Sequence, residues 1–195
     1  MQPQIQIRHG IPPALCGAAA RLYWRHFAAA LQPLPTAPRQ GAALVRSAMQ
    51  PDRAIIALTP QGGLIALAGL RNADGGFLSG SVSGFIATFG PARGRLRHLA
   101  TGLHRGGTQT GDLILDGVAV RRGWQRRGIA RALVLAAEAE ARRQGYPALL
   151  AEVEAANDAA LAAWQRLGFC PIGRQRQGWP WNRPAHVLRR PVPAS

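Results

Sequence analysis

A strand–turn–helix unit in residues 113–143 constrains the fold of this chain more than any other feature. An apolar run, Leu113–Val120, is typical of a buried strand, and Ile129 begins a helical pattern that lasts to about Arg143. The connection is dense in arginine and glycine and reads Arg121-Arg122-Gly123-Trp124-Gln125-Arg126-Arg127-Gly128. The first backbone N–H groups of a helix lack partners within it and lie at the positive end of the helix dipole. Such a turn between strand and helix therefore predicts a site for an anion, phosphate above all.

The residues at the start of the predicted helix exclude two common classes of phosphate-binding loop. Gly128 and Ala130 carry little or no side-chain bulk, so a phosphate can approach the backbone closely. The chain has no Lys for a Walker A loop, and its glycine spacing does not fit the dinucleotide pattern Gly-x-Gly-x-x-Gly. Instead, Gln125–Ala130 resembles the Gln/Arg-x-x-Gly-x-Gly/Ala loop that binds the pyrophosphate of coenzyme A in the GCN5-related N-acetyltransferase (GNAT) superfamily.

Residues further along the chain extend this resemblance. A second apolar strand, Ala148–Val153, is followed by Asn157 and by a short helix that ends in Trp164-Gln165-Arg166-Leu167-Gly168-Phe169. In the superfamily, a strand bearing Glu, an Asn and a helix closing on Tyr-x-x-x-Gly-Phe recur at similar spacing. The resemblance covers Leu113–Ile172 by motif and the earlier residues by element order. Its pattern is closest to the branch of ribosomal-protein N-terminal acetyltransferases.

The resemblance implies an α+β fold with α/β/α layers, the GNAT acyl-CoA acyltransferase fold. In that fold a central mixed sheet carries helices on both faces, and its fourth and fifth strands splay apart. The N-terminal pattern agrees with the element order strand, helix, helix, strand, strand, predicted at Ile5–Ile7, Pro13–Ala30, Gly41–Met49, Ala54–Leu58 and Leu64–Leu70. Pro33, Pro35 and Pro38 should exclude a helix between the first two helices. Short strands at Ile172–Arg174 and Ala185–Arg189 should end the fold.

We expect a single GNAT domain over residues 1–195, with an inserted excursion at about 72–111. The superfamily usually joins its third and fourth strands by a tight hairpin, and a structureless loop of this length is unusual in a compact domain. Helical structure is therefore predicted at Phe85–Phe89 and Leu96–Leu103. The excursion is basic, with Arg93, Arg95, Arg97, His98, His104 and Arg105. Two interpretations stay open: a solvated basic surface, or a flap that borders the acceptor site or contacts an anionic partner.

Composition limits the partners and the compartment. All 24 basic residues are Arg and the formal net charge is +15, which produces a field that attracts an anionic ligand such as coenzyme A. The arginines are dispersed and accompany no reading motif or aromatic stacking face, which disfavours nucleic acid as a partner. Cys16 and Cys170 are too few for a disulfide scaffold, and neither a signal-peptide core nor a membrane-spanning run is present. We expect a cytoplasmic monomer or homodimer without membrane attachment and without a metal.

Acetyl transfer from a thioester to a primary amine requires a base, because an alkyl ammonium group titrates near ~10.4 and must lose a proton to attack. Glu152 lies in an apolar strand, where desolvation should make its carboxylate a stronger base. It precedes Trp164 by the separation between the catalytic Glu and Tyr of the ribosomal-protein branch. The alternative is a strand-end Glu152 that points into water beside Glu154. Asp116, on the adjacent strand, is the second candidate and could hold a water or the amine. Its alternative is a buried Asp that accepts hydrogen bonds from backbone N–H groups.

The resemblance also assigns residues to acetyl-CoA as cosubstrate. The backbone of Val118–Val120 would pair with the pantetheine amides like one more strand, and the N–H of Val118 or Ala119 would donate to the thioester oxygen. The expected cofactor-binding residues are Val118, Ala119, Val120, Gln125, Arg126, Arg127, Gly128, Ile129, Ala130 and Asn157. Asn157 is also a favoured helix N-cap, and both roles can hold together.

Trp164 stands where the family's Tyr donates a proton to the departing thiolate. An indole N–H can donate a hydrogen bond but cannot act as a general acid. The alternative for Trp164 is a core residue, since Leu161, Trp164 and Leu167 recur at helical spacing. The candidate catalytic residues are therefore Glu152, Asp116 and Trp164.

Two functions remain in competition. The leading hypothesis is an acetyl-CoA-dependent N-acetyltransferase that acts on a primary amine, either a protein N-terminus or side chain or a small amine. The alternative is a non-catalytic acyl-CoA-binding protein. The sequence does not identify the acceptor amine, because in this superfamily the N-terminal helices and loops select it.

Overall fold

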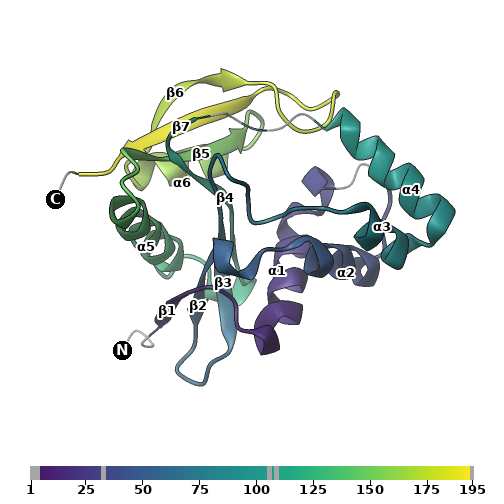
Figure 1. The fold of residues 1–195 in the computed structure, drawn as a ribbon. Coiled ribbons are helices and arrows are strands. Elements are labelled where there is room, and N and C mark those ends of the chain that lie inside the picture. Colours follow the sequence, from purple (N-terminus) through teal and green to yellow (C-terminus); the bar gives the residue numbers. More distant parts are fainter. Residues whose placement is uncertain (1–4, 32–33, 105–106, 108–109, 194–195) are drawn as a thin grey trace.

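The computed structural model describes residues 5–31, 34–104, 107 and 110–193, which form one seven-stranded sheet flanked by helices (Figure 1). The strand order is β1-β2-β3-β4-β5-β7-β6, and only the β4–β5 pair is parallel. The strands are β1 (Gln6–His9), β2 (Ala54–Leu58), β3 (Leu64–Arg71), β4 (Leu113–Val120), β5 (Ala148–Glu154), β6 (Cys170–Gln175) and β7 (Ala185–Pro191). The α-helices are α1 (Cys16–Leu31), α2 (Pro38–Ala48), α3 (Val82–Phe89), α4 (Pro91–Ala100), α5 (Ile129–Arg143) and α6 (Asp158–Arg166). Within the described ranges, no helix has the length and apolar character that crossing a bilayer requires.

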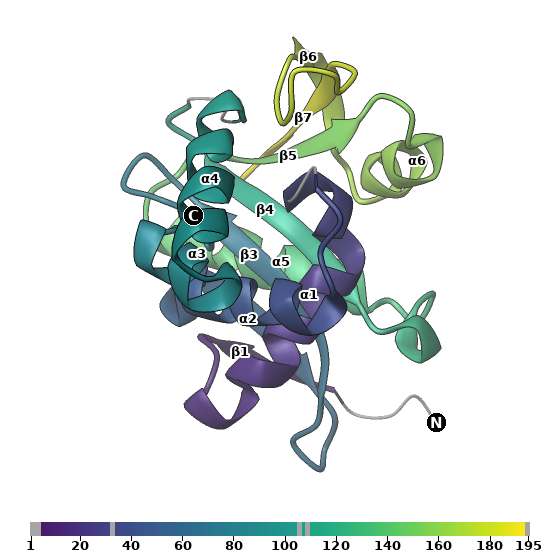
Figure 2. The same cartoon turned by 90° about the vertical axis from the view of Figure 1, so that its right-hand side faces the viewer.

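Helices cover both faces of the sheet, as the resemblance implies. Alternate residues of β2 show this arrangement, because Ile55 and Ala57 join the hydrophobic cluster under α5. Ala54 and Ile56 instead join the cluster under α1 and α2. Figure 2 shows α1 and α2 on the near side of the strands, with α5 behind them. A strand covered on both faces is apolar along its whole length, and every residue of β2 is buried. The predicted fold class is confirmed.

The two central strands splay apart, also as predicted. Their parallel ladder has three pairs, Leu113–Leu149, Ile114–Leu150 and Leu115–Ala151. Beyond Leu115, β4 continues to Val120 and stays paired with β3 on its other side. The β3–β4 register shifts opposite Gly69, where Gly117 has a φ of 97°, a conformation that favours glycine. The bulge therefore lies where the sheet opens.

Some boundaries differ from the sequence-based predictions. α2 begins at Pro38, whereas the pattern predicts a start at Gly41 and treats Pro38 as excluding a helix, so that prediction is wrong. Proline is tolerated at the first helical position because the N–H there would have no partner within the helix. β1 extends to His9 because His9 pairs with Ile55 of β2. The last two strands are longer than predicted because they pair with each other in an antiparallel hairpin.

The segment between β3 and β4 contains helices, as its apolar pattern predicts. Ser81 caps α3 by accepting a hydrogen bond from the Gly84 N–H at 3.3 Å, and Gly90, with a φ of 83°, leads into α4. α3 and α4 lie in close contact, since a Cβ added at Gly94 would come within 2.6 Å of the Phe85 carbonyl oxygen. Arg105 of the basic stretch lies outside the described residues. The extent of the domain, and the status of this segment as an insertion, stay predictions.

Candidate active site

The predicted phosphate loop forms the N-terminus of α5. Gly128 is the N-cap, with a φ of 75°, and no described side chain caps the helix. A Cβ added at Gly128 would meet no atom within 4 Å, so the backbone there is open to a ligand. Gln125 donates from Nε2 to the Val120 carbonyl oxygen at 3.1 Å, which ties the loop to the end of β4. An uncapped helix N-terminus with open space in front of it fits the pyrophosphate of acetyl-CoA.

Arginine side chains surround this loop. Arg126 and Arg127 are both exposed, and Arg126 has a φ of 59°, which is uncommon for a residue other than glycine. The Arg127 guanidinium lies 5.2 Å from the ring centroid of Trp124, a cation–π contact that holds positive charge at the loop. Ile129 is buried in the core, so it anchors the start of α5, and Ala130 is half-buried beside it.

The free edge of β4 leads into the phosphate loop. Ala119 is buried under α1, whereas Val118 and Val120 pack against the cluster on the α5 side. The backbone of these residues lies beyond the last β4–β5 pair. An extended chain carrying amides can pair with such an edge as an added strand. The geometry therefore suits the pantetheine pairing that the resemblance implies for Val118–Val120.

Two carboxylates flank the point where the sheet opens. Asp116 and Glu152 directly follow the last parallel pair, Leu115 and Ala151. Arg71, the last residue of β3, contacts both: its Nη2 lies 2.8 Å from Glu152 Oε2, and its Nε lies 3.7 Å from Asp116 Oδ1. The side chains of Arg71, Asp116 and Glu152 are 18%, 31% and 11% exposed. When both carboxylates are ionised, two anions and one cation give this cluster an excess negative charge that suits an ammonium group.

Several donors surround the Glu152 carboxylate. Besides Arg71, the Gln177 amide, with its nitrogen facing Glu152, donates to the two carboxylate oxygens at 2.9 and 3.0 Å. Gly107 approaches so closely that an added Cβ would lie within 2.4 Å of Glu152 Oε2. The alternative of a Glu152 that points into water beside Glu154 is therefore wrong, although Glu154 itself is exposed. The surroundings of Glu152 are more polar than its apolar strand suggests.

Asp116 lies in a different environment. Although part of its side chain reaches solvent, burial raises the pKa of Asp116, and the negative charge of Glu152 adds to the rise while Arg71 opposes it. The Asp116 backbone oxygen accepts a hydrogen bond from the Tyr23 hydroxyl at 2.9 Å. Burial, reinforced by the Asp116 charge, raises the pKa of Tyr23 well above its usual range, so its phenol stays neutral. The principal partner of the Asp116 carboxylate is a guanidinium, rather than the backbone N–H groups of the alternative interpretation.

Asn157 and Trp164 occupy structural positions as well as candidate functional ones. Asn157 is the N-cap of α6, and its Oδ1 accepts a hydrogen bond from the Ala160 N–H at 3.0 Å. Trp164 is half-buried, and its ring meets Phe169 edge-on with centroids 4.8 Å apart. The capping and core alternatives are therefore both present. The cofactor role of Asn157 and the catalytic role of Trp164 stay predictions.

Sequence reasoning missed three residues of this cluster: Arg71, Tyr23 and Gln177. Arg71 ends an apolar strand, but its position beside Asp116 depends on the β3–β4 pairing and its register shift, which the sequence pattern does not specify. Tyr23 belongs to an apolar helical stripe in the sequence, and no neighbouring residue indicates that its hydroxyl makes a specific contact. Gln177 lies in a loop whose path depends on the β6–β7 hairpin, so no sequence pattern predicts its contact with Glu152.

Comparisons with known proteins agree with this fold. Among the solved structures that resemble the fold is a GCN5-related N-acetyltransferase from Kribbella flavida, with a TM-score of 0.61 and 21% identity, covering 96% of this chain and 98% of that one. Another is the ribosomal-protein-S18-alanine N-acetyltransferase of Escherichia coli, with a TM-score of 0.56, 20% identity and coverage of 98% and 96%. A third is a proposed acetyltransferase of Salmonella typhimurium, described with its cofactor acetyl-CoA, at a TM-score of 0.59, 16% identity and coverage of 98% and 95%.

At these identities the structures establish the fold alone. Among curated proteins, none matches the sequence. The model of the acetyltransferase (GNAT) family matches residues 30–169, which include the free edge of β4, the phosphate loop and both carboxylates. The chain therefore belongs to the acetyltransferase (GNAT) family.

Proposed function

We propose that this protein is an acetyl-CoA-dependent N-acetyltransferase that transfers an acetyl group directly to a primary amine. One observation carries the proposal. The opening between β4 and β5 has the phosphate loop beyond the end of β4 and an ion-paired carboxylate cluster where the strands separate. A cofactor lying along β4 would place its thioester end near that cluster.

The chain offers a binding group for each part of the cofactor. The backbone N–H groups of Gln125–Ala130 would bind the pyrophosphate, with Arg126 and Arg127 adding charge. The backbone of Val118–Val120 would pair with the pantetheine amides, and the N–H of Val118 or Ala119 would stabilise negative charge on the thioester oxygen. Asn157 would face the cofactor while it caps α6. Bound acetyl-CoA supplies the activated acetyl group.

The carboxylate cluster would receive the amine and take its proton. The amine nitrogen attacks the thioester carbon, the carbon–sulfur bond breaks, and the sulfur leaves as a thiolate. The proton lost by the nitrogen passes to the Asp116–Glu152 pair, directly or through water. Glu152 is the base indicated by the family spacing, whereas the raised pKa of Asp116 favours holding the proton there. The two carboxylates would act as one proton-accepting unit, because both contact Arg71 and the charge of Glu152 affects proton binding at Asp116.

Titration with acetyl-CoA by calorimetry, followed by a primary-amine panel with thiol detection, tests this function. We expect saturable binding and amine-dependent release of free thiol. The panel should contain short peptides with free N-termini as well as small amines, since both kinds of acceptor are open. Binding without thiol release from any amine would support the alternative, a non-catalytic acyl-CoA-binding protein. Absence of binding would contradict both.

A further inference from the structure

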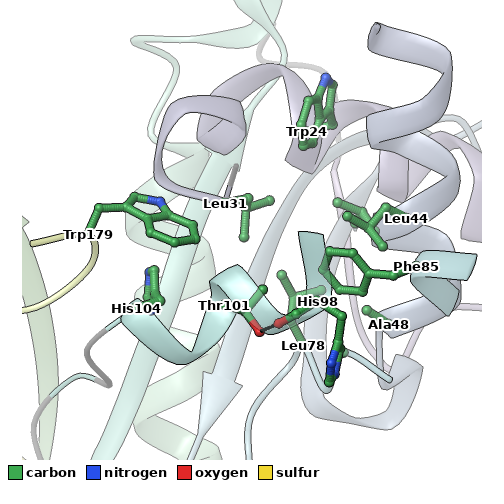
Figure 3. A pocket seen from close by; sticks show the side chains of 12 residues that line it. Trp24, Leu31, Leu44, Ala48, Leu78, Phe85, His98, Thr101, His104 and Trp179 are labelled. Atoms are coloured by element: carbon green, nitrogen blue, oxygen red, sulfur yellow. Dashed lines mark hydrogen bonds between the residues drawn. The ribbon is translucent and has the colours of Figure 1, made fainter. Parts of the chain in front are cut away.

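A cavity of about 270 Å³ is lined by residues of α1, α2, the α3–α4 segment and the β6–β7 loop (Figure 3). Its walls include Trp24 and Leu31 from α1, Leu44 from α2, Phe85 from α3, and His104 and Trp179 from the loops. In Figure 3, Trp179 and His104 stand at one end, and Phe85 and Leu44 at the other. None of the proposed cofactor-binding residues belongs to this lining, so the cavity is separate from the proposed cofactor site.

Two short chain segments connect the cavity to the carboxylates. Trp179 lines the cavity, and Gln177, two residues earlier, donates to Glu152. Trp24 also lines the cavity, and its neighbour Tyr23 donates to the Asp116 backbone oxygen. Residues two apart have Cα atoms no more than about 7 Å from each other. The cavity and the carboxylates are therefore contacted by neighbouring residues of the same two chain segments.

The lining is apolar, aromatic and without Arg, Asp or Glu. Trp179 is fixed in place, because its Nε1 donates to the Ala30 carbonyl oxygen at 3.0 Å. The His104 ring meets Trp179 edge-on, with centroids 5.1 Å apart, and burial lowers the pKa of His104, which favours its neutral form. Such a cavity favours an apolar group, because burial of apolar surface is favourable, and it offers no counter-charge to a second cation.

The volume points to one aromatic group. An engineered apolar cavity of about 150 Å³ binds benzene, and this cavity of about 270 Å³ is larger by enough to take a ring with a short side chain. Flat indole and phenyl groups in the lining, Trp24, Phe85 and Trp179, favour a flat occupant.

We infer that the acceptor is an arylalkylamine: an uncharged aromatic ring fills this cavity, and a short alkyl chain presents the primary amine to Asp116 and Glu152. The inference rests on the proposed acetyl transfer and names its acceptor class. It also assigns the α3–α4 segment to the acceptor site, because Phe85, His98 and Thr101 come from that segment or directly follow it.

Two measurements test the acceptor class. The first compares kcat/KM for 2-phenylethylamine and 1,4-diaminobutane at saturating acetyl-CoA, with thiol detection, and we expect at least a tenfold preference for the aromatic amine. The second follows the tryptophan fluorescence of the protein with coenzyme A as 2-phenylethylamine is added, and needs no turnover. Equal efficiency with both amines would overturn the inference and leave the acetyltransferase function standing. Cavity binding of 2-phenylethylamine without thiol release would instead uphold the cavity assignment and overturn the function.

A matched pair of glycine substitutions tests whether 2-phenylethylamine binds in this cavity. Gly80 lines the cavity, and an added Cβ there would lie 3.6 Å from the Phe85 ring, whereas a Cβ at Gly102 would meet no atom within 4 Å. Both residues are exposed, so neither larger side chain needs to enter the core. Gly80→Leu should raise KM and the binding constant Kd for 2-phenylethylamine at least tenfold with acetyl-CoA affinity unchanged, and Gly102→Leu should change none of these. Equal effects of the two substitutions, or no effect of Gly80→Leu, would refute the cavity assignment.

Discussion

Asp116 and Glu152 occupy matching positions on β4 and β5, one residue beyond the last parallel pair, and Arg71 contacts both. The opening of the sheet thus separates the two backbones while leaving the two carboxylates around one guanidinium. Because the negative charge of Glu152 helps to raise the pKa of Asp116, a change that removes the Glu152 charge should alter proton binding at Asp116.

Asp116→Asn should lower the activity of the enzyme without lowering the stability of its fold. It removes the proton acceptor with the raised pKa, and general acid–base groups contribute about 10²–10⁴-fold, so kcat should fall by at least about 10²-fold. Activity of the natural chain should rise with pH through the raised pKa of Asp116, since the carboxylate must be ionised to accept a proton. The variant should lose that limb of the pH–rate profile. If kcat falls less than threefold, Asp116 is not the acceptor, and Glu152→Gln becomes the deciding variant.

The same substitution should not destabilise the fold. A folded-state pKa above the unfolded value means that the folded protein binds the proton more tightly, so ionisation of Asp116 lowers the unfolding free energy as pH rises above ~4. Asn cannot ionise, so the variant should be as stable as the natural chain near pH 4 and at least as stable at pH 8. Urea denaturation at the two pH values measures this difference. A marked loss of stability at pH 8 would show that the Asp116 charge stabilises the folded state.

Arg71→Met should leave two carboxylates without their shared cation. Arg71 opposes the rise in the pKa of Asp116, so its removal should raise that pKa further and move the pH–rate profile to higher pH. Removing one partner of a largely buried ion pair also costs about 3 kcal/mol of unfolding free energy. Arg71→Lys keeps the charge and is the control, so its profile should lie near that of the natural chain. An unchanged profile for Arg71→Met would mean that the titrating base lies elsewhere.

The sequence predicts the two halves of the site to different degrees. The phosphate loop is local: Gln125–Ala130 carries its glycine, its helix start and its arginines within a few residues, and its position follows from that pattern. The carboxylates were identified one at a time from the strands that carry them. Their shared partner, Arg71, was not, because strand periodicity does not specify the β3–β4 bulge that sets the register there.

Features that depend on contacts between distant parts of the chain are still harder to predict from the sequence. The contact between Gln177 and Glu152, and the cavity wall formed by Trp179, depend on how the β6–β7 loop returns to α1. The helices of the α3–α4 segment follow from its apolar residues, but their packing against α2 does not. At Pro38 the sequence pattern predicts too little helix: proline disfavours helix interiors, but here it begins α2.

Gly128→Glu should weaken the binding of acetyl-CoA at the phosphate loop. It adds a carboxylate at the N-terminus of α5, where the pyrophosphate would lie, in a position with a φ of 75°. Gly145→Glu is a matched control, because Gly145 follows the other end of the same helix with a φ of 78° and equally open space around its Cβ position. Calorimetry should show at least a tenfold loss of affinity for the first variant and little change for the second. Equal losses would trace the effect to backbone strain, and wild-type affinity in Gly128→Glu would refute the loop assignment.

Trp164→Tyr tests the position where this chain departs from the family motif. An indole cannot act as an acid, so the leaving thiolate of coenzyme A should take its proton from water. A phenol at this position could donate that proton, so Trp164→Tyr should raise kcat, or at least not lower it. The smaller ring leaves space beside Phe169, where the indole now packs edge-on, so the variant should lose some stability. Trp164→Phe makes a similar cavity without a hydroxyl and is the control, so the difference in kcat between the two variants isolates the phenol. Should Trp164→Tyr fold, bind acetyl-CoA normally and still lose activity to the same extent as Trp164→Phe, then Trp164 contributes through packing and not through the leaving thiolate.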